Sequence, residues 1–346
     1  MSIYLERYAF PNQLIESKPK ENLALVVTIP CYNEQSLLPC LHSLKNCQLP
    51  EGISIEVLVI INESENEAES ISNVNQRCFE EAKLWTKDNS TPALSFYILH
   101  EKLPKKHAGV GLARKMIMDE ATRRLDAAGK PNGVIVCFDA DCTCADNYLT
   151  EIYNFFEHNP KSPGASIYFE HPLEGPFEEC VYSAIVDYEL FLRFYVNALR
   201  FADFPHAFET IGSSMAVRAS AYQKQGGMNK RKAGEDFYFL HKIIPLGHFG
   251  EINATYVFPS PRKSDRVPFG TGRAVNQWLL ENKLETYALE TFVDLKAFNQ
   301  LVPTIYEHSL KTIWKDLPQS MADFIDQYNL QSEIDKINAG SLPAFL

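Results

Sequence analysis

Short apolar runs alternate with amphipathic stretches over the first 160 residues of the chain. Four of these runs are rich in β-branched and aromatic residues, which is typical of buried strands: Leu23–Pro30, Ile55–Asn62, Leu94–His100 and Gly133–Cys142. Between the first two runs, Leu37, Leu41 and Leu44 recur at helical spacing. Strands that alternate with helices form parallel sheets with both faces covered. The pattern therefore predicts an α/β fold with a mostly parallel central sheet.

The alternation weakens after Pro160. The pattern there predicts a long aromatic helix over Glu178–Phe201 and a strand, turn and short helix over 210–228. Prolines and glycines mark a basic loop over 258–273, and the chain beyond it is helix-rich. We divide the chain into an N-terminal extension, two successive parts of the α/β region and a helical C-terminal appendage: residues 1–22, 23–160, 161–273 and 274–346.

Composition narrows the class of protein. With 45% hydrophobic and 22% charged residues the chain is an ordinary globular protein. Its 44 acidic and 33 basic residues give a net charge of −11, which argues against nucleic acid as a partner. The eight cysteines lack the spacing of zinc or redox motifs, and no signal peptide or run of eighteen apolar residues is present. We expect a soluble cytoplasmic protein, with the inner face of the membrane as an alternative location.

Polar residues follow three of the predicted strands. Ligands of parallel sheets bind beyond the carboxyl ends of the strands, so Tyr32–Glu34, Asn62–Ser64 and Asp139–Asp141 should line one edge. Alternation along an extended backbone would point Asp139 and Asp141 to the same side. Two such carboxylates suit Mg²⁺ or Mn²⁺ bridging a diphosphate. The alternative is a pair of solvated turn residues, one of which caps the next helix.

Two further charged groups are candidates for chemistry. Glu235 and Asp236 open a predicted helix after Gly234, a place where acidic residues ordinarily complement the helix dipole. The loop over 262–266 carries Arg262, Lys263 and Arg266. Most charge clusters are solvated surface, but in an acidic protein a basic loop could clamp a leaving phosphate.

Six segments together resemble a known family. In chain order they read VVTIPCYNE, VLVIINES, GVGLARKMIMDEA, VIVCFDADC, IGSSMAVRASAYQKQGGM and AGEDFYFLHKI. Their order and spacing resemble the family-2 nucleotide-sugar glycosyltransferases of the GT-A fold, over roughly Leu23–Arg273. The resemblance implies a GT-A-like, Rossmann-type α/β/α sandwich with a mostly parallel central sheet. It also implies that residues 23–160 form the donor-binding half and residues 161–273 the acceptor-binding half with the catalytic base.

The resemblance also implies roles for individual residues on the donor side. The turn after the first strand would hold the nucleobase, and Asn62 stands where the family usually has an aspartate, so this contact is altered. Asp141 would coordinate a divalent metal, Mn²⁺ or Mg²⁺, on the diphosphate, and Asp139 would reach the ribose or the metal. The full set of implied nucleotide-binding residues is Pro30, Tyr32, Asn33, Glu34, Asn62, Arg114 and Asp139.

On the acceptor side the resemblance implies that Asp236 is the catalytic base and that Glu235 orients the acceptor. Gly212, Ser213 and Ser214 match the segment beneath the acceptor. Some members place a metal-binding histidine in the late loop. Here Arg262, Lys263 and Arg266 would instead contribute positive charge at the leaving phosphate.

These residues lead us to expect a metal-dependent inverting glycosyltransferase. It would move a hexosyl or N-acetylhexosaminyl unit from a nucleotide sugar, expected to be a UDP-sugar, to a hydroxyl of a carbohydrate or lipid-linked acceptor, with peripheral membrane association left open. A nucleotidyltransferase would be expected to carry a glycine-rich, arginine-bearing loop where this chain has CYNEQS. A two-metal phosphohydrolase and a non-catalytic carbohydrate-binding protein also stay open.

Overall fold

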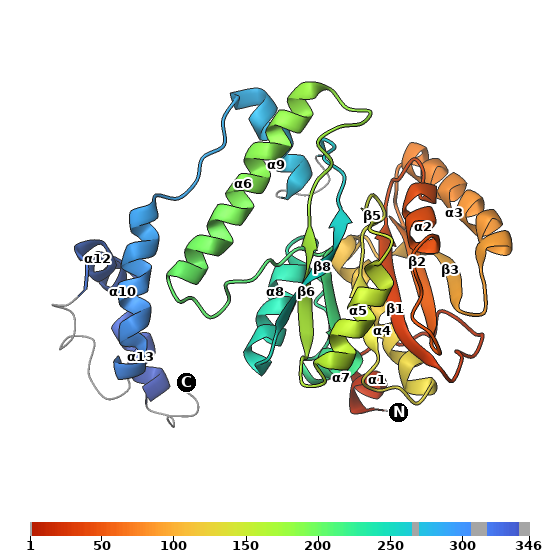
Figure 1. The fold of residues 1–346 in the computed structure, drawn as a ribbon, viewed down its shortest axis with the longest axis horizontal. Coiled ribbons are helices and arrows are strands. Elements are labelled where there is room, and N and C mark those ends of the chain that lie inside the picture. The colour runs from red at the N-terminus through yellow and green to blue at the C-terminus, as the bar shows by residue number, and fades with distance from the viewer. Residues whose placement is uncertain (1, 265–269, 306–316, 339–346) are drawn as a thin grey trace. The chain divides into compact units, whose positions relative to one another are not determined.

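The fold is built on one mixed sheet. The computed structural model describes residues 2–264, 270–305 and 317–338. These residues form an eight-stranded sheet in the order β3-β2-β1-β4-β7-β6-β8-β5 (Figure 1). Its strands are β1 (Leu23–Cys31), β2 (Ser54–Ser64), β3 (Leu94–Leu103), β4 (Val134–Cys137), β5 (Thr143–Cys144), β6 (Gly164–Phe169), β7 (Met215–Arg218) and β8 (Gly250–Phe258).

The first four strands in this order are parallel. Strand β1 lies between β2 and β4, and β2 pairs with β3 on its other side. Strand β7 runs antiparallel to both β4 and β6, whereas β6 and β8 are parallel and β5 is antiparallel to β8. Nearly every residue of β1 and β2 is buried, as expected when helices cover both faces of a parallel sheet. The predicted α/β fold with a mostly parallel sheet is confirmed.

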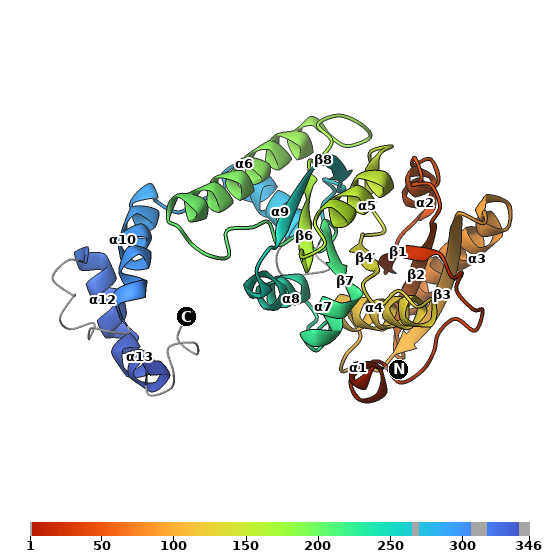
Figure 2. The same cartoon turned by 60° about the horizontal axis from the view of Figure 1, so that its bottom comes forward.

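Helices flank the sheet (Figure 2). Helix α4 packs on β1 and β2, α3 packs on β3, and α5 packs on β8. The helices are α1 (Ile3–Arg7), α2 (Leu38–Lys45), α3 (Glu69–Asn89), α4 (Val110–Ala127), α5 (Tyr148–His158), α6 (Glu179–Phe201), α7 (Ala219–Lys224), α8 (Glu235–Ile243), a 3₁₀ turn η1 (Ile244–Leu246), α9 (Thr271–Glu281), α10 (Leu289–Ile305), α12 (Gln319–Gln327) and α13 (Leu330–Asn338).

Strands β6 and β8 are absent from the pattern-based prediction. In β8, exposed and buried positions do not alternate regularly, and two polar residues interrupt the apolar run. Its pairing with β6 and β5 is a tertiary contact, which local periodicity does not report. The helices predicted over Glu178–Phe201 and after residue 273 are confirmed.

The chain forms two compact units. The first comprises Met1–Ile185 and Thr210–Leu279, and the second comprises Val186–Glu209 and Leu280–Leu346. The sheet and all described candidate site residues belong to the first unit, so the division at residue 160 between donor and acceptor halves lies within it and remains a functional prediction. No helix in the described part of the chain is both long and apolar enough to span a membrane.

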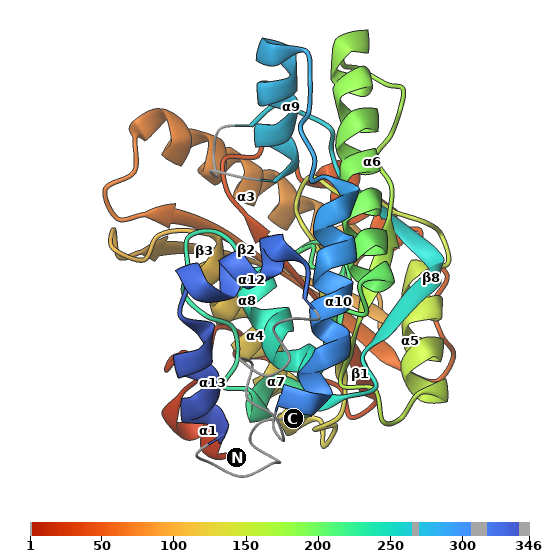
Figure 3. The same cartoon turned by 90° about the vertical axis from the view of Figure 1, so that its left-hand side faces the viewer.

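The second unit is helical, as expected for the C-terminal appendage. Its helices α10, α12 and α13 are coloured blue in Figure 3. Its core combines residues from the end of α6 and the following loop with one aromatic side chain of α10: Ala198, Leu199, Ala202, Ala207 and Phe292. A smaller cluster around Leu317 and Ile325 packs α12 against α10. The second unit therefore has its own apolar core, which α6 and the following loop form together with α10.

The N-terminal extension is fastened to α4 by a buried carboxylate. Asp119 is fully buried and accepts hydrogen bonds from the Tyr4 hydroxyl, the Tyr222 hydroxyl and the Phe10 backbone N–H, each at 2.7 Å. Lys115 forms an ion pair with the same carboxylate at 3.0 Å. One side chain thus joins the extension to α4 and α7.

We expect Asp119→Ala to lower the free energy of unfolding by about 3–5 kcal/mol, because it leaves the buried Lys115 charge without its carboxylate. Urea denaturation followed by circular dichroism would measure this. Asp88→Ala removes an exposed carboxylate from α3 and is the matched control. Equal stability losses in the two variants would contradict the role assigned to Asp119.

Candidate active site

The turn after β1 meets the end of β2, as the sequence predicts. The last residue of β1, Cys31, pairs with Ile61 in the parallel register, so the turn begins beside Asn62, near the end of β2. Asn33 adopts a left-handed conformation with φ of 52°, which asparagine tolerates better than most residues. Its backbone N–H donates to the Asn75 side chain at 2.9 Å. Tyr32 and Asn33 are half-buried at this edge, and Asn62 is buried within β2.

The carboxylate beside Asn62 lies in the segment predicted to line this edge, but the sequence assigned it no role. Glu63 is buried and accepts a hydrogen bond from Asn75 Nδ2 at 3.3 Å. Burial raises the pKa of Glu63, but hydrogen bonds from Asn75 and Ser72 and the positive charge of its partners outweigh burial, so the pKa is lowered. The acidic residue next to Asn62 was a signal in the sequence. Nothing in the sequence marked Asn75, which lies on α3.

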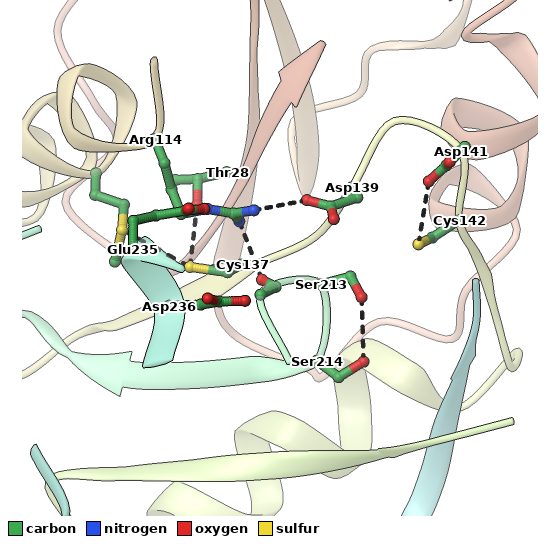
Figure 4. A network of polar contacts seen from close by, with 12 residues as sticks. Thr28, Arg114, Cys137, Asp139, Asp141, Cys142, Ser213, Ser214, Glu235 and Asp236 are labelled. Atoms are coloured by element: carbon green, nitrogen blue, oxygen red, sulfur yellow. Dashed lines mark hydrogen bonds and ion pairs between the residues drawn. The ribbon is translucent and has the colours of Figure 1, made fainter. Parts of the chain in front are cut away.

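The geometry predicted for the two aspartates after β4 is wrong. Strand β4 ends at Cys137, and the chain turns at 140–141, so the alternation of an extended strand does not apply. Asp139 Oδ1 accepts from Arg114 Nη2 at 2.9 Å, whereas Asp141 Oδ2 accepts from Arg262 Nη2 at 2.8 Å. Figure 4 shows Asp139 directed at Arg114 and Asp141 lying well apart from both. The two carboxylates therefore serve two different guanidinium groups.

Arg114 of α4 joins three segments that are distant in the sequence. Its side chain is only 2% exposed. Nη2 bonds to Asp139, Nη1 donates to the Gly212 carbonyl at 3.0 Å, and Nε donates to Glu235 Oε1 at 3.1 Å (Figure 4). All three nitrogens of the guanidinium thus have protein partners. This arginine connects the acidic turn after β4 with the acidic start of α8. The nucleotide contact expected of Arg114 stays a prediction.

Gly212 leaves room for the site. A Cβ atom at this position would lie 2.9 Å from Asp236 Oδ2 and 3.0 Å from Arg114 Nη2. Ser213 and Ser214 follow in the same turn and are buried, with their hydroxyl oxygens 3.5 Å apart. The structure therefore places Gly212 against the predicted base, and the role of the turn in holding an acceptor stays a prediction.

Glu235 and Asp236 have raised pKa values. Burial is the largest cause for both, and the Arg114 charge acts in the opposite direction. The charge of Asp236 adds to the raised pKa of Glu235, and that of Asp139 adds to the raised pKa of Asp236. Glu235 is 3% exposed and its carboxylate holds Arg114, so its contact with an acceptor stays a prediction. A raised carboxylate pKa is typical of general bases.

Arg262 joins a second pair of acidic residues. Nη1 donates to Glu34 Oε2 at 2.7 Å, and Nη2 donates both to Glu34 Oε1 and to Asp141 Oδ2. Glu34, predicted to bind the nucleobase, is 4% exposed and holds the guanidinium through both oxygens. Lys263 beside it is exposed, and Arg266 lies outside the described residues. Three residues with different predicted roles thus meet here: Arg262 as a phosphate contact, Glu34 as a nucleobase contact and Asp141 as a metal ligand.

The carboxylates of the site fit a hard divalent ion whose remaining ligands come from a substrate. No group of three or more His, Cys, Asp or Glu residues that could hold a metal occurs in the described parts of the chain. Mg²⁺ commonly uses one or two carboxylates together with substrate phosphates. The Asp141 side chain is 27% exposed and provides such a carboxylate. Asp139 is 38% exposed, but one of its oxygens is bonded to Arg114.

Comparison with known families decides the class. The family model described as glycosyl transferase family 2 matches residues 26–226, which is more than half of the chain. The chain belongs to glycosyl transferase family 2. This family uses nucleotide-sugar donors and has a GT-A-like fold, so the predicted family and fold are both confirmed. The matched segment contains Arg114, Asp139 and Gly212.

Solved glycosyltransferases are similar at low identity. Residues 1–349 of TarS from S. aureus, in complex with UDP-GlcNAc, are 13% identical with a TM-score of 0.47, covering 84% of this chain and 75% of that one. The mannosyltransferase PcManGT from Pyrobaculum calidifontis, in complex with GDP-Man and Mn²⁺, is 16% identical with a TM-score of 0.41, covering 98% and 82%. No curated protein sequence matches the chain significantly.

We compare the free energy of unfolding of Asp236→Asn with that of the unchanged protein. We expect this difference to favour the variant more at neutral pH than in acid. Because the folded-state pKa of Asp236 is raised, stability is lost as pH rises from the ordinary value near 3.9 through the raised one. The amide removes this loss. The variant's stability relative to the unchanged protein should therefore increase across that window and level off above it.

Urea denaturation from pH 3.5 to 8 would measure this difference, with Asp88→Asn in α3 as an exposed control. A relative stability of Asp236→Asn that falls as pH rises would contradict the raised pKa.

Proposed function

We propose that the chain is a metal-dependent inverting glycosyltransferase that moves a hexosyl or N-acetylhexosaminyl unit from a UDP-sugar to a hydroxyl of a carbohydrate or lipid-linked acceptor. One observation carries this proposal: Arg114 ties Asp139, at the donor edge of the sheet, to Glu235, which neighbours the predicted base Asp236. Family membership supports the reaction class. The convergence supports placing the donor and the acceptor hydroxyl at this one site.

Asp236 would accept the proton of the acceptor hydroxyl. As that oxygen forms its bond to the anomeric carbon, the bond from this carbon to the diphosphate oxygen breaks and the diphosphate leaves with the electron pair. Attack from the face opposite the leaving group inverts the anomeric carbon, and no nucleophile from the enzyme is needed. The raised pKa of Asp236 makes the carboxylate a better proton acceptor once it is ionised.

Negative charge on the departing diphosphate would be met by Arg262 and Lys263. Arg262 lies directly beside Asp141, so its guanidinium is within reach of a group bound there. A divalent ion held by Asp141 would supply Lewis-acid stabilisation of the same charge. Tyr32 and Asn33 line the edge where the nucleobase is expected, and Arg114 would keep Asp139 oriented toward the ribose.

The experiment is a thermal-shift panel of nucleoside diphosphates and nucleotide sugars, with and without Mn²⁺, followed by a transfer assay on sugar acceptors. We expect stabilisation by UDP and a UDP-sugar that requires Mn²⁺. A phosphohydrolase would instead release inorganic phosphate without an acceptor. The absence of any shift with any nucleotide would overturn the proposal and favour a non-catalytic protein.

Asp236→Asn should reduce turnover by about 10²–10⁴-fold, because it removes the proton acceptor, while leaving donor affinity within about twofold. Steady-state transfer rates and UDP titration would measure the two effects. Asp88→Asn, on the exposed face of α3, should change neither. Full turnover by Asp236→Asn would show that another group takes the proton.

A further inference from the structure

A guanidinium nitrogen fills a position between two carboxylates at the edge of the sheet where the nucleotide sugar is proposed to bind. Arg262 Nη2 lies 2.8 Å from Asp141 Oδ2 and also bonds to Glu34 Oε1. Nη1 bonds to the second oxygen of Glu34, so the contact with Glu34 is bidentate. Glu34 and Asp141 come from the turns after β1 and β4, two strands that pair in parallel. The two carboxylates thus converge on one point, which a cation of this chain already occupies.

The same point suits a divalent ion. Carboxylate oxygens are the ligands that Mg²⁺ and Mn²⁺ prefer, and one or two of them per ion are usual where a substrate phosphate completes the shell. A guanidinium nitrogen and a divalent ion exclude each other from this one position, because both are positive and would lie in contact. Bidentate arginine–carboxylate pairs are among the stronger hydrogen-bonded pairs, so displacing Arg262 has a cost.

We propose that Arg262 is a built-in competitor of the divalent cation at Asp141, and that Glu34 is the second carboxylate of the contested position. The inference rests on the proposed metal at Asp141 and extends it to two residues with other expected roles. A nucleoside diphosphate gives Arg262 an alternative anionic partner, so it draws the guanidinium away and opens the position. Metal and nucleotide therefore bind with positive coupling.

The test is direct Mn²⁺ binding, measured by the loss of the free-ion electron paramagnetic resonance signal, with no donor present. Arg262→Gln should bind Mn²⁺ at least about tenfold more tightly than the unchanged protein, although it loses a group proposed to assist the reaction. Arg262→Lys keeps the charge and should stay close to the unchanged protein. Lys161→Gln removes an exposed cation after α5 and controls for net charge.

Second variants locate the ion. Adding Glu34→Gln or Asp141→Asn to Arg262→Gln should abolish the gain in affinity, since each removes one carboxylate. In the unchanged protein, UDP should increase Mn²⁺ affinity severalfold, and this increase should shrink in Arg262→Gln. Circular dichroism and urea denaturation would establish that each variant is folded, which we expect because Arg262 lies in a loop after β8.

Equal or weaker Mn²⁺ binding by Arg262→Gln would overturn the inference, as would the absence of binding in that variant. A gain that survives removal of Glu34 and of Asp141 would also overturn it. These readouts do not depend on sugar transfer. If the transfer assay fails for every donor while Arg262→Gln still gains Mn²⁺ affinity, the proposed function fails and the inference about Arg262 stands.

Discussion

A single buried charge, the guanidinium of Arg114, is the constraint on which the site depends. A buried ion is costly unless it is paired and hydrogen-bonded, so α4 can keep this side chain inside only if other segments supply acceptors. They come from the turn after β4, the turn before β7 and the first residue of α8. The hydrogen bonds of one arginine therefore fix three segments relative to each other. These segments carry the predicted base and one predicted ribose contact.

Arg114 and Arg262 differ in burial and in the residues that they contact, and these differences suit them to different roles. Arg114 is 2% exposed and all its partners belong to the chain, so it acts as a fixed part of the scaffold. Arg262 is 28% exposed and lies in a loop, where its partners are residues expected to meet substrate. The free-energy cost of breaking its ion pairs is smaller for Arg262, because water can hydrate the separated groups. The arginine that holds the scaffold and the arginine proposed to respond to substrate are therefore different residues.

Local pattern predicts β1, β2 and the helices after them, because full burial on both sides makes these strands continuous apolar runs. It fails where tertiary contacts decide. The backbone turns after Cys137, so the side chains of Asp139 and Asp141 contact different partners, although an extended strand would point them to the same side. The pairing of Glu34 with Arg262 spans 228 positions, and no periodicity connects them. The family resemblance named these residues, but it did not pair them.

The acidity of the site and its arginines form one electrostatic arrangement. Glu235 and Asp236 keep raised pKa values although Arg114 lies beside them, because burial and the charges of neighbouring carboxylates exceed its attraction. Fixed groups of this kind do not need to reorganise during reaction, which is the usual source of electrostatic catalysis. A carboxylate held at high energy by its neighbours gains more on taking up a proton than a solvated one does. Protonation would thus relieve the unfavourable charge at the start of α8 in the step proposed for Asp236.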